Sequence, residues 1–221
     1  MGEYTESRLL DSGDALVPTI GSYIKKLVKG NSSINNSGAR RDEPELRTVF
    51  HAQRIPPISI EDYLARIAKY SLCSKSCFVV AALYIKRITE PHGCSTDGVA
   101  QPRVVLTHHT VHRLLLTAIM LSAKFLDDTY YNNAYYAKVG GLPLSELNSL
   151  ELHFLAMIRF NLSITPEVYE LMENEIMADV LCSDAPDVRS GREALLNAGF
   201  NQSEVLEKLR FSQQQQQVIE T

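Results

Sequence analysis

The sequence lacks a hydrophobic run long enough to cross a membrane. Its longest apolar stretch, Leu114 to Ala123, is interrupted by Thr117 and Ser122, whereas a bilayer needs about 20 consecutive apolar residues. No basic segment followed by an apolar one stands at the N-terminal end, so we expect no secretory signal and no membrane partner.

The sequence also lacks an excess of basic charge and the cysteine density of a small secreted protein. Lysine and arginine number 22 against 26 acidic residues, for a net charge of −4 at pH 7. A surface that binds nucleic acid without regard to sequence needs clustered lysine and arginine, so we expect no nucleic-acid partner. Four cysteines among 221 residues are typical of reduced thiols in an intracellular protein. We therefore expect the chain in the nucleus, the cytoplasm or both.

The motifs of common enzyme classes are missing. The chain contains no phosphate-cradling or dinucleotide-binding glycine motif and no nucleophile elbow. His108 and His112 share a helix face at a spacing of four, but no third or fourth ligand follows at metal-site spacing. Asp127 and Asp128 are adjacent, and adjacent helical residues diverge by about 100°, so we expect them to end a helix. We predict no catalytic residue, cofactor, metal or small-molecule substrate.

Helical periodicity is what the sequence does have. Hydrophobic residues make up 45% of the chain, which is enough for a sizeable core, and we find no convincing run with period-two alternation. The predicted helices begin at Ser59, at Ser74, near Thr107, at Asn132, at Pro143 and at Thr165, and the helix from Pro143 is predicted to run on to Leu162. The helix after Ser74 is apolar on almost every side, so we expect it at the centre of an all-α bundle.

The composition divides the chain into three parts. Residues 1–54 are predicted to form an N-terminal extension with one possible short helix at 14–30, and are otherwise expected to be disordered. Residues 55–170 carry the helical bundle. Residues 171–221 form a C-terminal extension with a weaker helical pattern, closed by the glutamine tract at 213–217, which we expect to be disordered.

Two charged residues fall on the edges of otherwise apolar helix faces. Lys124 lies beside a stripe that ends at Phe125, and Glu151 is four residues from both Leu147 and Leu155. A carboxylate in an apolar stripe costs free energy unless it is paired, so Lys124 and Glu151 are candidates for a half-buried ion pair. Such a pair is either purely structural or positions a partner, and residue spacing leaves both readings open.

A cluster of tyrosines follows Asp128. Tyrosine has a large apolar body and a polar tip, which suits a partly exposed contact surface. The same residues equally suit the packing of a short helix onto the bundle. The cluster comprises Tyr130, Tyr131, Tyr135 and Tyr136, with Asn132 and Asn133 among them.

The segments "SIEDYLARIAKYS", "CFVVAALYIKRITE" and "SAKFLDDTYYNNAYYAKVGG" resemble the cyclin box of plant P-type cyclins, also called U-type. These cyclins are in turn similar to the fungal phosphate-pathway cyclins. The match runs from about Pro56 to Tyr169. It implies an all-α fold, namely a single five-helix cyclin box at 55–170 with flexible N- and C-terminal extensions. It further implies a regulatory, non-enzymatic subunit that binds and activates a cyclin-dependent kinase of the PSTAIRE type and couples cell division or phosphate signals to it.

The resemblance also assigns the kinase-binding residues. In cyclins, a lysine in the third helix and a glutamate in the fifth contact the kinase, and these positions fall on Lys124 and Glu151. The neighbouring apolar contacts carry over to Phe125 and Leu162. By binding only the inward position of the kinase C-helix, a rigid bundle of this kind shifts the kinase to its active state.

One departure from the cyclin pattern keeps alternatives open. Cyclins have an aspartate that pairs with an arginine of the first helix, here Arg66, at the position where this chain has Lys86. A degenerate cyclin that binds a kinase or a transcription partner without activating it is therefore an alternative. A transcription adaptor of the TFIIB type would need a second repeat and a basic face, which this chain does not offer.

Overall fold

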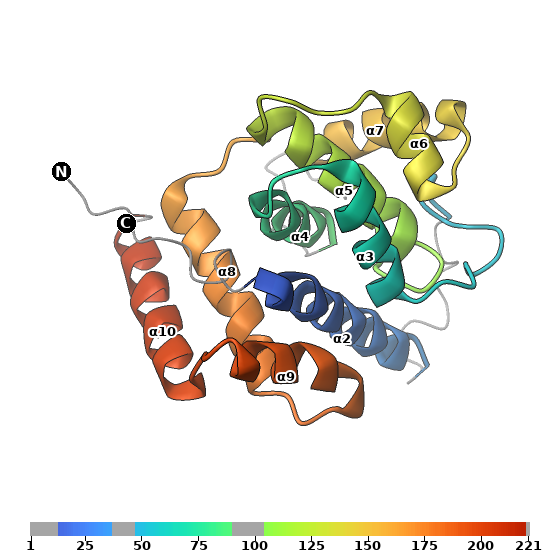
Figure 1. Cartoon of the computed structure of the whole chain (residues 1–221). Helices are drawn as coiled ribbons and strands as arrows, with labels where there is room; N and C mark the ends of the chain where they lie inside the picture. The colour runs from blue at the N-terminus through green and yellow to red at the C-terminus, as the bar shows by residue number, and fades with distance from the viewer. Residues whose placement is uncertain (1–12, 37–46, 90–103, 220–221) are drawn as a thin grey trace. The chain divides into compact units, whose positions relative to one another are not determined.

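The computed structural model describes residues 13–36, 47–89 and 104–219, and every regular element in these ranges is a helix (Figure 1). The predicted all-α class is confirmed. The elements are, in chain order, η1 (Gly13–Ala15), α2 (Leu16–Asn36), α3 (Ile60–Ser71), α4 (Ser76–Thr89), α5 (Val111–Leu126), α6 (Asn133–Gly140), α7 (Leu144–Met157), α8 (Pro166–Leu181), η2 (Pro186–Val188), α9 (Arg189–Asn197) and α10 (Gln202–Ile219). Contacts divide the chain into two compact units, Ile24–Leu162 and the two terminal parts up to Tyr23 and from Ser163.

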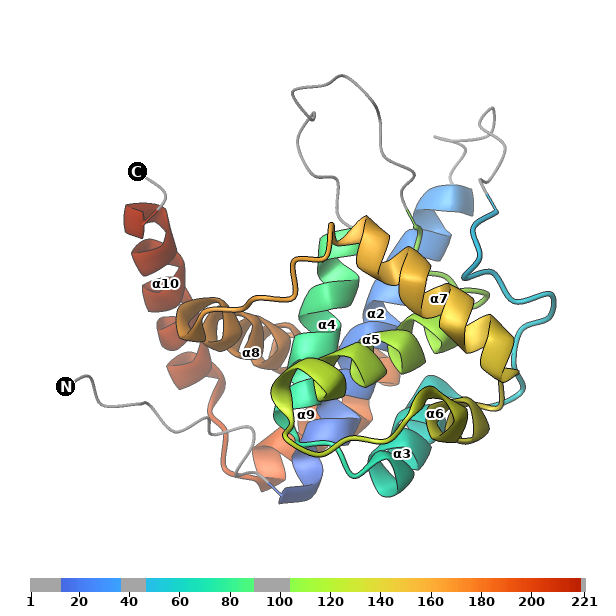
Figure 2. The same ribbon diagram turned by 90° about the horizontal axis from the view of Figure 1, so that it is seen from above.

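The centre of the first unit is the pair α4 and α5. Ten of the 14 residues of α4 and 12 of the 16 residues of α5 are buried. A helix that is apolar all round must be covered on all sides, and α5 accordingly packs against α3, α6 and α7 as well as α4 (Figure 2). The five helices α3 to α7 are the five predicted for the cyclin box. Helix α4 is largely buried, as we expected, but the helix that contacts all the others is α5.

Capping residues set the ends of these helices. The Ser59 hydroxyl accepts the Asp62 backbone N–H at 3.0 Å and begins α3 as predicted. Asn132 does the same for α6. Gly141, with φ +70°, ends α6 in the left-handed conformation that glycine adopts without strain. Pro143 lies at the N-cap of α7, one position before the first-turn site that we expected.

Helix α2 is longer than the short helix predicted at 14–30. It runs to Asn36, so residues 31–36, which we expected to be disordered, are helical, and residues 37–46 lie outside the described residues. In the first unit, Ile24 and Val28 are buried and the Lys25 ammonium lies 2.7 Å from the Glu61 carboxylate. Tertiary contacts of this kind stabilise a helix that its local sequence specifies only weakly. The compact unit therefore begins at residue 24, whereas we placed the start of the box at 55.

The second unit is built on α8, which contacts α9 and α10. Thr165 caps α8, as predicted, by accepting the Val168 N–H. The glutamine tract is a difference from our expectation, because α10 continues through it to Ile219. Glutamine, glutamate and lysine are good helix formers, so a helix that is started by packing against α8 has no residue that breaks it there.

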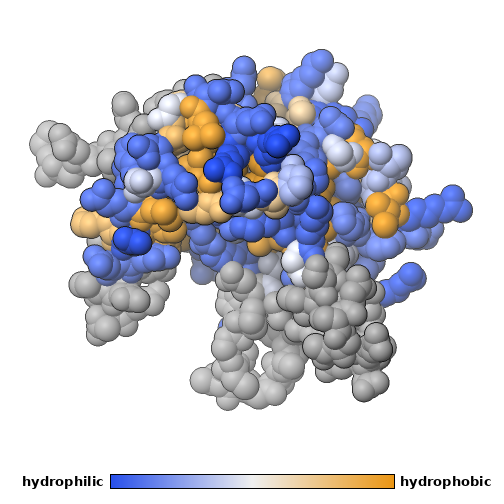
Figure 3. Space-filling model, turned by 90° about the horizontal axis from the view of Figure 1, so that it is seen from below, coloured by the Kyte–Doolittle hydropathy of each residue, from blue (hydrophilic) through white to orange (hydrophobic). Residues whose placement is uncertain are grey.

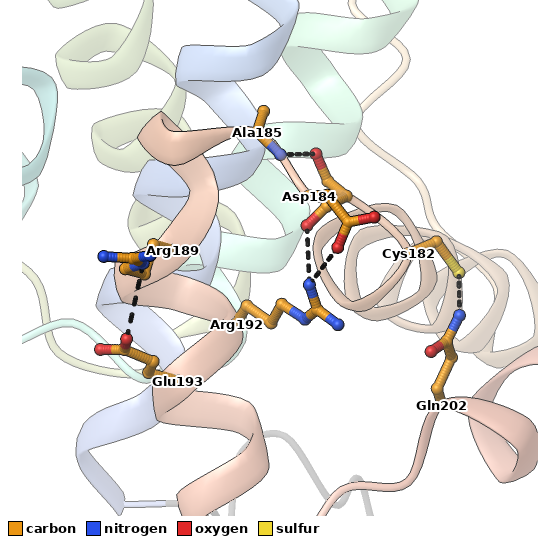
Figure 4. Close-up of polar contacts among 8 residues, drawn as sticks. Cys182, Asp184, Ala185, Arg189, Arg192, Glu193 and Gln202 are labelled. Carbon is orange, nitrogen blue, oxygen red and sulfur yellow. Dashed lines mark hydrogen bonds and ion pairs between the residues drawn. The ribbon is translucent and has the colours of Figure 1, made fainter.

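The connection between α8 and α9 is held by one arginine (Figure 4). Arg192 donates to the Asp184 carboxylate at 2.5 Å and to the Ser183 carbonyl at 3.4 Å. Beside it, Gln202 donates to the Cys182 sulfur at 3.3 Å. The exposed Arg189–Glu193 pair, at 3.9 Å, adds little, since such surface pairs contribute between about 0 and 1 kcal/mol.

The surface view in Figure 3 shows a face on which hydrophilic residues predominate and apolar residues form separate small groups. Among the residues that the structure describes, no helix combines the length and the apolar character needed to cross a bilayer.

A close approach between Gly191 and the backbone of Pro18 yields a stability prediction. A Cβ on Gly191 would lie 2.8 Å from the Pro18 carbonyl oxygen and 2.6 Å from the Ser22 hydroxyl, which also accepts the Gly191 N–H. The backbone carbonyl cannot turn aside, so we expect Gly191→Ala to destabilise the protein by about 1 to 3 kcal/mol in urea unfolding.

The matched control is Gly30→Ala in α2, where an added Cβ meets no atom within 4 Å. There we expect a gain of about 0.5 to 1 kcal/mol, because alanine favours the helix over glycine. Equal effects of the two substitutions would contradict the close approach at Gly191.

Candidate functional site

Lys124, Asn133 and Glu151 form a closed polar network. The Lys124 ammonium donates to Glu151 Oε1 at 2.6 Å and to Asn133 Oδ1 at 2.5 Å. The Asn133 amide nitrogen donates to Glu151 Oε2 at 2.6 Å. The side chains of Lys124 and Glu151 are 25% and 17% exposed, so the ion pair is half-buried, as the sequence suggested.

The three residues come from three helices. Lys124 lies in the last turn of α5, where a cation also favours the negative end of the helix dipole. Asn133 is the first residue of α6, directly after the capping Asn132, and Glu151 lies in the middle of α7. The Asn133 amide also donates to Asn148 Oδ1 at 2.8 Å. The network therefore ties the ends of α5 and α6 to α7.

The network keeps hydrogen-bonding capacity for a partner. An ammonium has three donors and a carboxylate has about four lone pairs. Two donors of Lys124 and one lone pair on each oxygen of Glu151 are used inside the network. Because both groups are already held in place, a partner that binds them does not have to order two long side chains.

The role of Asn133 was not among our predictions from the sequence. We considered it only as a member of the tyrosine cluster, because an asparagine between two tyrosines gives no periodic signal. An ion pair between Lys124 and Glu151 requires only that α5 and α7 lie side by side. The third residue is supplied by the tertiary position of α6, which a single sequence does not reveal.

Apolar side chains near the network are exposed. Buried residues of α5 end at Ala123, and Phe125 is 48% exposed. Our placement of Phe125 in the core stripe was therefore wrong, since the last turn of α5 is not covered by its neighbours. The other large exposed apolar residues of these elements are Leu126 at the end of α5, Leu144 and Leu152 on α7, and Phe160 just after α7.

Leu162 is placed differently from the other three predicted contacts. It is half-buried, and its carbonyl accepts the Tyr84 hydroxyl at 2.7 Å. Phe160, two residues earlier, is 67% exposed and lies in the left-handed region with φ +56°. The sequence indicated that α7 continued here, whereas α7 ends at Met157 and Phe160 stands outside it.

The tyrosine cluster splits between core and surface. Tyr136 is fully buried, whereas Tyr130 is 54% exposed. Tyr131 and Tyr135 stack with their ring centroids 3.8 Å apart, and the Tyr135 hydroxyl donates to the Tyr70 carbonyl at 2.9 Å. The packing interpretation therefore holds for Tyr136 and for the hydroxyl of Tyr135, and the contact surface stays a prediction for the exposed Tyr130.

The histidine pair considered for a metal is used differently. His112 is buried, its Nε2 lies 3.0 Å from the Ile58 carbonyl, and its ring packs edge-on against Tyr63. Among the described residues, no three histidine, cysteine or acidic side chains cluster as metal ligands do. Asp127 ends α5, and its carboxylate accepts the Ser74 N–H at 2.8 Å.

Arg66 finds a different acceptor from the aspartate that cyclins usually provide. Its guanidinium donates to the Val139 carbonyl at the end of α6 and lies 5.3 Å from the Tyr63 ring centroid. Lys86 lies half-buried in the last turn of α4, where the helix dipole favours a cation. The lysine is thus compatible with the fold, and Arg66 joins α3 to α6.

The network predicts an unequal effect of two asparagine substitutions. Asn133→Ala removes hydrogen bonds to both charged partners, and we expect a loss of about 1 to 3 kcal/mol in urea unfolding. Asn148→Ala, at an exposed position, removes one neutral hydrogen bond and should cost less. Equal losses would show that Asn133 does not hold the pair.

His112 predicts a pH dependence of stability. A carbonyl only accepts, so Nε2 carries the proton, and Nδ1 is buried with no partner among the described residues. Burial lowers the pKa of His112, and the bond to Ile58 partly offsets this. The folded state therefore binds fewer protons than the unfolded state, and stability is lost as the pH falls below about 6.5.

In His112→Gln, an amide replaces the titrating ring and retains a donor for Ile58. We expect the difference in unfolding free energy between about pH 7.5 and about pH 5.5 to shrink in this variant. If the unfolding free energy of the variant changes between these two pH values by as much as that of the native chain, a group other than His112 causes the pH dependence.

Comparisons with known proteins agree with this architecture. The family model described as "Cyclin" matches residues 14–162. The chain is 42% identical over 154 residues to Cyclin-U4-1 of Arabidopsis thaliana, covering 70% of each chain. It is 36% identical over 204 residues to Cyclin-P3-1 of Oryza sativa subsp. japonica, covering 88% of this chain and 80% of that one. It is 32% identical over 184 residues to PHO85 cyclin-7 of Saccharomyces cerevisiae, covering 78% and 65%. The resemblance to plant U-type and P-type cyclins is confirmed, and the chain belongs to the cyclin family.

Proposed function

We propose that the chain is the regulatory subunit of a cyclin-dependent kinase, which it binds and activates through the surface around Lys124 and Glu151. The observation that carries the proposal is the Lys124–Asn133–Glu151 network, a preformed charged site beside exposed apolar side chains. Phe125 and Leu162 are the predicted apolar contacts, and we add Phe160 on account of its exposure. The partner we favour is a kinase of the PSTAIRE type.

The chemistry of such a site suits a kinase helix and its flanks. A charged pair that is held by three helices offers charge-assisted hydrogen bonds, which are roughly twice as strong as neutral ones. Aromatic side chains such as Phe125 and Phe160 supply apolar area that becomes dry on binding, as in the energetic centres of protein interfaces. The combination favours a specific protein partner over a small molecule.

Activation then requires no catalytic group on this chain. A kinase holds its ATP phosphates productively only when a strand lysine pairs with the glutamate of its C-helix. A rigid bundle that binds only the inward position of that helix raises the population of the active kinase by its differential affinity. We propose that the helices α5, α6 and α7, tied together by Asn133, supply this rigidity.

The signals that reach the kinase belong to the same proposal. The yeast relative is named a cyclin of PHO85, and the fungal phosphate-pathway cyclins are the second group that the sequence resembles. We propose that this subunit couples nutrient signals, phosphate among them, or cell division to its kinase.

A second candidate is a degenerate cyclin that binds a kinase without activating it. The observation that favours it is Lys86 in place of the usual aspartate, with Arg66 directed to Val139 instead. If the aspartate–arginine pair is needed to keep the bundle in its activating form, the chain would bind and leave the kinase inactive.

Charge reversal separates a structural role of the pair from a binding role. Lys124→Glu and Glu151→Lys should each weaken binding to a purified PSTAIRE-type kinase by at least about tenfold, or about 1.4 kcal/mol. The double reversal restores an ion pair, and Asn133 can turn its amide to serve it. We expect the double variant to regain stability in urea unfolding and still fail to bind the kinase or stimulate histone phosphorylation.

The matched control reverses Glu204 and Lys208, an exposed pair on α10 at 3.9 Å, which should leave binding unchanged. If the double reversal at 124 and 151 binds like the native chain, the pair is only structural. Binding without phosphorylation would support the degenerate cyclin. Failure of the native chain to bind any of a panel of such kinases would overturn both candidates.

A further inference from the structure

Thr165 and Pro166 form a dipeptide that the proposed kinase surface does not use. No other serine or threonine of the 221 residues stands directly before a proline. Proline-directed protein kinases, among them the cyclin-dependent kinases, select an acceptor hydroxyl that is followed by proline. The dipeptide therefore has the sequence of a phosphorylation site, and the surrounding structure decides whether a kinase can reach it.

The segment that carries Thr165 is exposed. Residues 158–165 join α7 to α8 without forming a helix, and Thr165, Pro166 and Glu167 are all exposed. Ser163, two residues earlier, is exposed as well but is followed by isoleucine. A hydroxyl can be phosphorylated only where a kinase reaches it, and both Thr165 and Ser163 meet this condition. Only Thr165 also has the proline.

The backbone at Thr165 is extended and makes few hydrogen bonds. Its φ of −84° and ψ of 157° are those of an extended chain, which a following proline favours. Among the described residues, none accepts the backbone N–H of Ile164 or of Thr165, and proline has no N–H. The Thr165 carbonyl accepts the Tyr169 N–H at 3.1 Å. Since a kinase binds its acceptor segment as an extended chain, few contacts of Thr165 have to break.

The Thr165 hydroxyl caps its helix more weakly than Ser59 and Asn132 cap theirs. It accepts the Val168 N–H at 3.5 Å, beyond the usual range of about 2.7 to 3.2 Å. Ser59 and Asn132 each accept the corresponding N–H at 3.0 Å. Pro166, at the first position of α8, fixes the backbone of the turn in any case. The cap bond of Thr165 is therefore a weak competitor for the hydroxyl.

We propose that Thr165 is phosphorylated by a proline-directed protein kinase. Thr165 Oγ1 attacks the γ-phosphorus of ATP and forms a P–O bond, while the bond from that phosphorus to the bridging oxygen breaks and ADP leaves. The hydroxyl proton passes to the catalytic aspartate of the kinase. The products are phosphothreonine and ADP, and no electrons are gained or lost.

Phosphorylation would add charge to an already acidic helix. Helix α8 contains no lysine or arginine, and Glu167 lies in its first turn. A phosphate brings a charge of about −1.5 to −2 at pH 7, which the positive end of the helix dipole favours and the Glu167 carboxylate opposes. Its oxygens can also accept the Val168 N–H in place of the hydroxyl. We therefore expect α8 to remain folded and its surface charge to change.

The phosphate would lie close to one predicted kinase contact, and this consequence rests on the proposed function. Leu162 is three residues before Thr165, and three extended residues span at most about 11 Å. The Debye length is about 8 Å in physiological salt, so the phosphate charge is only partly screened at Leu162. A kinase that contacts Leu162 thus meets a different charge once Thr165 is modified.

The test uses the full chain, ATP and a purified mitogen-activated protein kinase, a proline-directed enzyme that needs no cyclin. Trypsin then releases the peptide 160–189, which holds both Ser163 and Thr165. Fragmentation in a mass spectrometer should place the phosphate on Thr165 and leave Ser163 unmodified. Equal phosphorylation of the two residues would contradict the proposal, because exposure alone would then explain the reaction.

Two substitutions separate the dipeptide from the helix cap. Pro166→Ala keeps the hydroxyl and a residue that favours the helix, and it should slow the phosphorylation of Thr165 at least about tenfold. Thr165→Asn keeps a favoured capping residue and should abolish phosphate incorporation into the peptide 160–189. An unchanged rate in Pro166→Ala would overturn the proposal. The native helical circular dichroism of both variants is the control for folding.

A second arm replaces this enzyme with the PSTAIRE-type kinase that the chain itself is proposed to activate. Phosphate on Thr165 in this arm identifies the bound kinase as a source of the modification. Phosphate on Thr165 in the first arm alone assigns the site to a separate proline-directed kinase, and it supports the proposal even if the proposed function fails. Absence of phosphate on Thr165 in both arms overturns the proposal even if the kinase complex forms.

Discussion

The burial of α4 and α5 against each other is the constraint on which the rest of the first unit depends. Both helices are apolar on nearly every side, and neither can be covered by one partner alone. Helices α3, α6 and α7 therefore have to surround α5. Since burying apolar surface contributes about 25 cal/mol per Å², this central pair dominates the free energy that holds the unit together.

The burial of α5 also determines where its charged residues can lie. Buried residues of α5 end at Ala123, and only beyond it do Lys124 and Asp127 appear. Each then makes a specific contact, Lys124 to α6 and α7 and Asp127 to the start of α4. The functional surface we propose adjoins this end of α5. A helix that is buried over most of its length keeps its charged contacts at its two ends, here Arg113 with Glu146 in the first turn and Lys124 with Glu151 in the last, because a buried charge must be paired.

Two differences from the sequence-based expectations have one physical origin. Phe125 continues the apolar stripe of α5, and "RFNL" continues the apolar pattern of α7, yet Phe125 and Phe160 are exposed. Periodicity tells which residues share a face, and it does not tell where the neighbouring helix stops. The buried centre of a protein–protein interface is more apolar than its rim, so periodicity alone does not distinguish an exposed residue of such a centre from a residue of the protein core.

The sequence by itself determined the helices of the bundle, the capping residues Ser59 and Thr165, the burial of α4, and the candidacy of Lys124 and Glu151. Each of these depends on local hydrogen bonds or on periodicity, which short segments carry within themselves. The tertiary structure alone decided that Asn133 completes the charged network, that Arg66 turns to Val139, and that α2 extends to Asn36. These features depend on contacts between segments far apart in the chain, and those contacts exist only after the apolar helices have packed.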